Sequence, residues 1–104
     1  MKLLLVTAIR ECQKAVDTIF DSNGIKKYSL TDIYGIGNNS KPDHTGNWFG
    51  RSVANENLFD SVMLFCFTED SVAQKTLADL KTYNETQKPV FPLRALILPV
   101  EESI

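Results

Sequence analysis

The sequence predicts a single α+β domain of the ferredoxin-like βαββαβ topology, with a long loop between the second and third strands. Strand-like and helix-like hydrophobic periods follow one another in that order. The 104 residues, 43% of them hydrophobic, suit one globular domain. Residues 37–58 carry neither period. Each βαβ half is then expected to hold two parallel strands joined by a right-handed crossover, with both helices on one sheet face.

The first strand is predicted over residues 2–9, where an apolar run is short enough for a strand buried on both faces. The run is also similar to a signal peptide, but it ends at Arg10 and Glu11 without a small-residue cleavage site. No stretch of the sequence approaches the roughly 18 apolar residues of a membrane span. We therefore expect a buried first strand.

A helix is predicted from Glu11 to Ser22, because apolar residues recur at the spacing of one helical face. Asn23 and Gly24 end it, since glycine tolerates the left-handed cap conformation. The next strand, residues 28–36, mixes apolar and polar residues on both sides, which favours a place near a sheet edge. The helical face consists of Cys12, Ala15, Val16, Ile19 and Phe20.

The third strand is predicted over residues 59–67 and the last over residues 93–98. Between them lies a helix that fades near residues 85–86. Ser71 with Gln74 fits a capping box at its start, and Thr68 is a competing cap. The inner face of this helix is expected to carry Ala73, Leu77, Leu80 and either Tyr83 or Asn84.

Two helices can cover only one face of this sheet, yet three strands are apolar on both faces, at residues 3–6, 62–67 and 95–98. An antiparallel sheet with one wet face should alternate apolar and polar residues. An uncovered apolar face favours association. We expect a closed homo-oligomer, most simply a trimer. The alternative is that the C-terminal tail or the loop folds back over this face.

Composition excludes some classes of function. The net charge of −2 leaves no basic footprint for nucleic acid. Cys12 and Cys66 fall at apolar positions and are expected to be reduced core residues. No Ser/His/Asp set, metal-ligand cluster or glycine-rich nucleotide motif is present, and pairing Cys66 with His44 as a nucleophile is weak because a thiol inside an apolar strand is inert. We expect no enzymatic activity.

Three local features, in this order and spacing, resemble the PII signal-transduction superfamily over the whole chain, residues 1–104. Tyr34-Gly35-Ile36-Gly37 is similar to the Gly-aromatic-Gly that opens the family's T-loop. The long loop, about residues 37–58, stands where the T-loop does. Leu98-Pro99-Val100-Glu101-Glu102 is similar to the Pro-Val-Glu after the family's last strand. The chain thus resembles a divergent PII-like protein.

The resemblance implies a cytoplasmic homotrimer without catalytic activity. It implies that a small effector, often an adenine nucleotide, binds in clefts between subunits. It also implies that the loop changes shape and docks on a partner protein, commonly a membrane transporter or an enzyme. The family's Gly-Asp-Gly-Lys phosphate turn is replaced here by Phe91-Pro92-Leu93-Arg94, which removes the glycine backbone that approaches phosphates but keeps a cation.

The expected ligand-binding residues follow from these features. Arg94 interrupts an apolar strand, where a buried arginine needs a partner, either an anion in the subunit cleft or a carboxylate such as Asp32 or Glu101. Gly35 and Gly37 either expose backbone to a ligand or simply end a strand, and Asn38 either binds a ligand or forms an Asx turn. The full set of ligand candidates is Gly35, Gly37, Asn38, Lys88 and Arg94.

The loop carries two further candidates. Trp48 and Phe49, with Arg51 nearby, are either anchors for a partner protein or a plug that packs back on the domain. His44, beside Asp43, is the only histidine, and it is the metal candidate of the alternative hypothesis, a metal-binding or metal-tolerance trimer of the same fold. A closed metal site needs about four ligands, so an adenine nucleotide is favoured over a divalent metal.

Overall fold

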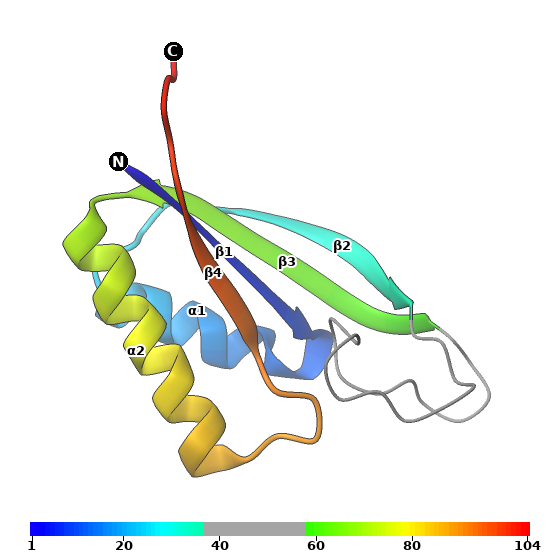
Figure 1. Cartoon of the computed structure of the whole chain (residues 1–104). Coiled ribbons are helices and arrows are strands. Elements are labelled where there is room, and N and C mark those ends of the chain that lie inside the picture. The colour runs from blue at the N-terminus through cyan, green and yellow to red at the C-terminus, as the bar shows by residue number, and fades with distance from the viewer. Residues whose placement is uncertain (37–57) are drawn as a thin grey trace.

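The computed structural model describes residues 1–36 and 58–104 and confirms the ferredoxin-like topology. The four strands form one antiparallel sheet in the order β2-β3-β1-β4. Figure 1 shows both helices on one face of this sheet. In chain order the elements are β1 (Lys2–Ile9), the 3-10 helix η1 (Arg10–Cys12), α1 (Gln13–Ser22), β2 (Ser29–Ile36), β3 (Leu58–Thr68), α2 (Asp70–Gln87) and β4 (Arg94–Pro99).

The strands begin and end within one residue of their predicted bounds. Since β3 lies between β1 and β2, and β1 between β3 and β4, each βαβ half joins parallel strands that are not neighbours. β2 is an edge strand, as its mixed composition predicts. Its helix-side residues stay largely open, with Tyr34 72% and Ile36 73% exposed, because the helices do not reach across it.

The predicted capping box at the start of α2 is wrong. Glu69 is the N-cap residue and makes no side-chain capping bond, while its carbonyl accepts the amide of Ala73 at 3.0 Å. The reason is that β3 continues to Thr68, which leaves one residue between strand and helix and places Ser71 inside the first turn. At the other end Lys88 adopts φ 45° and ψ 57°, a left-handed cap, and its amide bonds to the Asn84 carbonyl at 3.1 Å.

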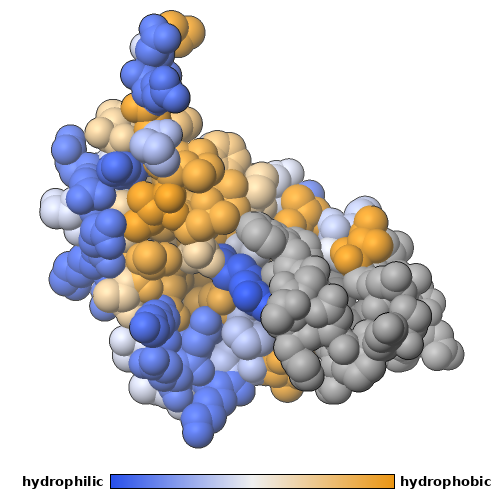
Figure 2. All heavy atoms as spheres, in the orientation of Figure 1, coloured by the Kyte–Doolittle hydropathy of each residue, from blue (hydrophilic) through white to orange (hydrophobic). Residues whose placement is uncertain are grey.

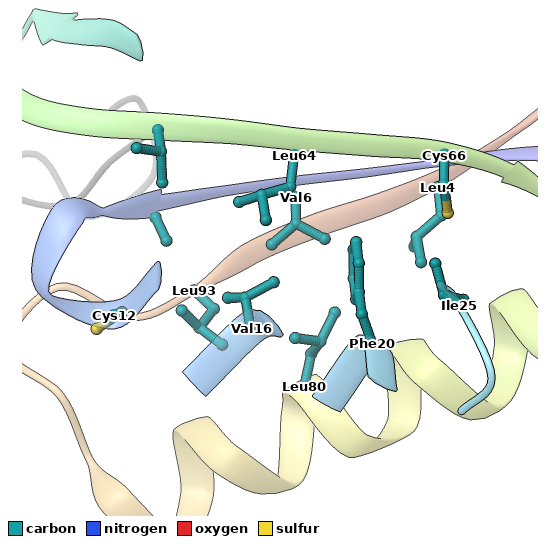
Figure 3. Packing of buried hydrophobic residues seen from close by; sticks show 12 residues of the cluster. Leu4, Val6, Cys12, Val16, Phe20, Ile25, Leu64, Cys66, Leu80 and Leu93 are labelled. Carbon is teal, nitrogen blue, oxygen red and sulfur yellow. The ribbon is translucent and has the colours of Figure 1, made fainter. Parts of the chain in front are cut away.

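The core lies between the sheet and the two helices. Phe20 and Val16 of α1 are completely buried, and Leu80 of α2 is 2% exposed. Figure 3 shows these side chains facing Val6 and Leu64 of the central strands. Burying a side chain such as Phe20 stabilises the fold by roughly 1.5–3 kcal/mol, and its ring also contacts Tyr28 edge-on at 4.9 Å.

The C-terminal tail does not fold back over the sheet. Residues 100–104 continue from β4 and run beyond the end of the sheet (Figure 1), and Glu101 to Ile104 are exposed. The tail therefore does not cover the apolar face, and the loop, residues 37–57, lies outside the described part of the chain. Within the described residues, no helix is long and apolar enough to cross a membrane.

The end of α1 is a Schellman motif. The amide of Ile25 bonds to the Phe20 carbonyl at 2.9 Å and the amide of Gly24 to the Asp21 carbonyl at 3.0 Å. Gly24 has φ +79°, and a Cβ added there would meet no atom within 4 Å. A substitution at this position therefore tests backbone conformation without a steric clash.

We predict that Gly24→Ala lowers the free energy of unfolding by about 1–2 kcal/mol, the cost of the left-handed conformation for an L-residue. Gly24→Asn should lose less, because asparagine tolerates this conformation better. Urea denaturation of the three proteins measures the difference. Equal stability of the Gly, Ala and Asn proteins would contradict this account of the cap.

Candidate functional site

The sheet face opposite the helices, called here the open face, carries an apolar patch. Side chains alternate along a strand, and the residues paired across strands share a face. Phe67 is 57% exposed and Leu98 45% exposed on this face. Figure 2 shows hydrophobic side chains gathered where β1 and β4 lie side by side. The patch consists of Phe67, Leu3 and Leu98 in one row and Phe65, Leu5 and Leu96 in the next.

A polar cluster, made of Thr7, Ser61 and Arg94, adjoins the patch on the open face. Thr7 pairs across the ladder with Arg94 of β4 and with Met63 of β3. Ser61 lies two residues from Met63 on β3, so it is a diagonal neighbour of Thr7, roughly 7 Å away. The open face thus changes from apolar to polar along the strands, toward the end where β2 and β3 lead into residues 37–57.

The two hydroxyls of this cluster are buried. Thr7 is 2% exposed and Ser61 0%, and among the described residues neither Oγ1 of Thr7 nor Oγ of Ser61 has a hydrogen-bond partner. Leaving a buried polar group unsatisfied costs about 1–3 kcal/mol. Native proteins keep few such groups, and each calls for a reason. A group from outside the described residues, such as a ligand or another copy, would give these hydroxyls partners.

Arg94 opens β4 and is exposed, so the prediction of a buried arginine is wrong for the single chain. It stands on an edge strand, where solvent reaches its side chain. Pairing with Asp32 does not occur, because Asp32 faces the helix side of the opposite edge strand and bonds to Arg10. Glu101 lies past the other end of β4. Arg94 therefore stands beside Thr7 in the sheet rather than beside either carboxylate.

The turn before Arg94 is held by one side chain from α2. Asn84 donates from Nδ2 to the Leu93 carbonyl at 3.0 Å, and its Oδ1 accepts the Leu93 amide at 2.9 Å. Leu93 is 4% exposed and belongs to the core. These bonds fix the start of β4, and hence the position of Arg94, although residues 88–93 contain no glycine. Lys88 begins this turn and is exposed.

Of the remaining predicted site residues, only Gly35 lies among the described residues. Gly35 is buried within β2, opposite Phe59. It stands on the open face but on the far edge from Arg94, about 14 Å away across three strand spacings and about 13 Å further along the strands, or roughly 20 Å in all. One chain therefore does not bring Gly35 and Arg94 into contact with one small ligand. The predicted residues Gly37, Asn38, His44, Trp48, Phe49 and Arg51 lie outside the described residues.

The cysteines have no feature of a nucleophile. Cys12 and Cys66 are free and buried, as predicted. Burial raises the pKa of both thiols, so the reactive thiolate is scarce near neutral pH. Cys66 lies on the helix-side face of β3, opposite Leu4.

A charged triad, missed in the sequence, lies on the helix side of the sheet near the same end. The Arg10 Nε donates to both carboxylate oxygens of Asp60 at 3.1 Å, and its Nη2 donates to Oδ1 of Asp32 at 2.6 Å. The hydrogen bonds to Asp60 and Asp32 raise the pKa of the Arg10 guanidinium. The three residues come from η1, β2 and β3 and are far apart in the sequence. No local sequence motif therefore predicts their contact.

Comparisons with known proteins identify the fold. No family model matches the sequence, and no curated protein matches it. Among solved structures, the chain is similar to CPII, a nitrogen regulatory PII-like protein from Thiomonas intermedia K12 bound to ADP, AMP and bicarbonate. The TM-score is 0.64 at 12% sequence identity, over 99% of this chain and 94% of that one.

A second similar structure is a putative PII-like signaling protein from Thermus thermophilus. Its TM-score is 0.59 at 18% identity, over 92% of this chain and 80% of that one. Both matches span nearly the whole chain. The chain therefore has the PII-like fold, and this confirms the fold that the resemblance implies.

The unpartnered hydroxyls give a prediction for the ligand-free protein. Thr7→Val and Ser61→Ala replace them with groups of similar or smaller size that need no hydrogen bond. Each change should raise the free energy of unfolding by about 1 kcal/mol, because a buried unsatisfied group is removed. Urea denaturation without ligand measures this. A loss of more than about 1 kcal/mol in both variants would show that the hydroxyls already have structural partners.

Proposed function

We propose that this chain is a PII-like regulatory protein without catalytic activity. In this proposal it forms a homotrimer, binds a small effector in clefts between subunits, and signals through the long loop to a partner protein. One observation carries the proposal: an apolar sheet face that neither the helices nor the tail cover, and that contains two buried hydroxyls, unpartnered within the described residues, beside an arginine. The PII-like fold of the chain supports it.

The assembly follows from the open face. The helices cover the other face, and the tail runs away from the sheet, so neither shields Phe67 and Leu98. Each large apolar side chain that moves from water to an interface gains roughly 1.5–3 kcal/mol when fully buried. Packing the open faces of several copies around one axis buries all the patches at once. We propose that the closed oligomer is a trimer, as the resemblance to PII proteins implies.

The effector site is proposed at the polar cluster. A guanidinium and two hydroxyls supply the donors that an oxyanion such as phosphate, carboxylate or bicarbonate accepts. CPII is bound to ADP, AMP and bicarbonate, which makes these three compounds the first effectors to test here. Because Gly35 stands on the opposite sheet edge, a ligand as large as a nucleotide would join Arg94 of one copy to groups of the next.

The partner would bind the loop. Trp48, Phe49 and Arg51 are the proposed contacts, since large apolar side chains with an arginine are the usual anchors of protein interfaces. We propose a cytoplasmic location and a protein partner, with a membrane transporter as the expected class. An effector that binds one loop state more tightly than another would shift the loop population and so the partner's affinity.

The metal-binding alternative gains no support from the site. Among residues 1–36 and 58–104 no three His, Cys, Asp or Glu side chains gather into a group that could hold a metal ion. His44 lies outside these residues. A divalent metal therefore stays the second effector class to test, behind the adenine nucleotides and bicarbonate.

A matched pair of variants tests the proposed assembly. Phe67→Asp places a charge in the apolar patch of the proposed interface and should reduce the protein to monomers in sedimentation velocity at micromolar concentration. Leu30→Asp is the control, because Leu30 is also an exposed strand residue, 40% open, but faces the helix side. A Phe67→Asp protein that sediments like the wild type would refute the open face as the interface.

The effector site is tested by thermal shift with ADP, AMP and bicarbonate, each supplied separately. A ligand at 100 times its Kd stabilises a protein by about 2.7 kcal/mol, which raises the Tm by several degrees. Arg94→Ala and Thr7→Val should weaken binding at least about tenfold, because each removes a donor to the ligand. Lys14→Ala, an exposed change on α1, is the control. Full shifts in the Arg94 and Thr7 variants would place the site elsewhere.

A further inference from the structure

The Arg10 triad ties three elements together at the end of the sheet that leads into residues 37–57. Arg10 follows directly on β1, Asp32 lies on β2 and Asp60 lies near the start of β3. One guanidinium spans both strands, with Nε on Asp60 and Nη2 on Asp32. Planar, two-sided contacts of this kind are specific to arginine, because lysine presents a single point charge.

The triad contacts β2 where the helices pack little against the strand. On its helix side β2 exposes Tyr34 and Ile36, so packing does not hold this part of the strand. Near its start, by contrast, Tyr28 donates to Asp17 of α1 at 2.6 Å and packs on Phe20. The Arg10–Asp32 contact likewise links β2 to a neighbouring element, but further along the strand, close to its end at Ile36.

Without the arginine the two carboxylates would repel each other. Tyr34 pairs with Asp60, so Asp32 and Asp60 are diagonal neighbours on the same face of adjacent strands. Two carboxylates that reach the same guanidinium lie close enough to repel each other once the positive charge is removed. Arg10 therefore converts a repulsive contact between β2 and β3 into a bridged one. The side chains are open to solvent, 40% for Arg10, 73% for Asp32 and 69% for Asp60, so this effect is of modest size.

The triad and the polar cluster share the same backbone segments. Ser61 of the cluster follows Asp60 directly and faces the open side of the sheet, whereas Asp60 faces the helix side. Ser61 pairs with Ile9, the residue before Arg10. The strand segments at Ser61 and Ile9 therefore also carry Asp60 and Arg10, the two ends of the contact. The contact in turn holds the ends of β2 and β3.

We propose that Arg10 is a positioning residue that locks the ends of β2 and β3 together and passes ligand occupancy at the polar cluster on to these two strand ends. The second half of this statement rests on the proposed effector site. The first half concerns the free protein alone. The two halves are therefore tested in separate arms of one experiment.

The first arm measures amide hydrogen exchange of the ligand-free, full-length protein. Arg10→Gln should speed amide exchange in residues 32–36 and 58–61 by about three- to tenfold, because the exposed Arg10–Asp32 and Arg10–Asp60 contacts are lost. Arg10→Lys should behave nearly like Arg10→Gln, because it keeps the charge but not the two-sided contact. Lys26→Gln is the control, since it removes an exposed ion pair, with Asp21, at the other end of α1.

This arm decides whether Arg10 holds the ends of β2 and β3 together. Exchange in residues 32–36 and 58–61 that matches the Lys26→Gln protein would overturn it. Wild-type exchange in Arg10→Lys alone would show that charge, and not the two-sided geometry, acts here, which would overturn the positioning role. Because a structural defect would speed exchange throughout the sheet, unchanged exchange in β1 and β4 is part of the expected result.

The second arm adds ADP or bicarbonate and measures affinity by calorimetry alongside exchange. In the wild type the bound probe should slow exchange in residues 32–36 and 58–61. In Arg10→Gln the probe should bind within about threefold of the wild-type affinity, yet leave this exchange unchanged. A full response in Arg10→Gln would overturn the coupling. Failure of the wild type to bind either probe would refute the proposed effector and with it the coupling, while the first arm would still decide the lock.

Discussion

The structure depends on one constraint, which is that two helices cover only one face of a four-stranded sheet whose central strands are apolar on both. The helix-side core holds the fold together through Val16, Phe20 and Leu80. The same strands point Leu3, Leu5 and Phe67 to the other side, where neither the helices nor the tail supply cover. The sequence that makes a stable core thus also makes a surface that is unfavourable in water.

In the proposed function, this constraint links subunit association to effector binding. The open face holds the apolar patch and, next to it, the polar cluster with its two buried hydroxyls, so a partner copy that covers the patch also encloses the cluster. Enclosure strengthens polar contacts, because the local dielectric falls. Asn84 fixes the turn before Arg94 from one side, and Arg10 ties the strand ends from the other. The cluster is therefore supported at one end of the sheet, by Asn84 at the β4 edge and by Arg10 at β2 and β3.

The sequence was sufficient for the elements and the topology, because strand and helix periods are strong and the core obeys them. It failed where local and tertiary preferences compete. Ser71 has the spacing of a cap, but the longer β3 displaces it. Arg94 was expected to be buried, yet it lies on an edge strand. Thr7 and Ser61 could not be recognised, since a threonine or serine in an apolar strand carries no sign that its hydroxyl lacks a partner, and the Arg10 triad depends on residues that only the sheet brings together.

The most direct test of the account is a crystal structure of the full-length protein grown with ADP and bicarbonate. The account predicts three copies around one axis, with Phe67 and Leu98 of each buried against its neighbours. It also predicts a ligand oxygen within hydrogen-bond distance of Thr7 Oγ1 and Arg94. Copies that meet through other surfaces and leave the open face in solvent would contradict the central claim that this face is the interface and the frame of the site.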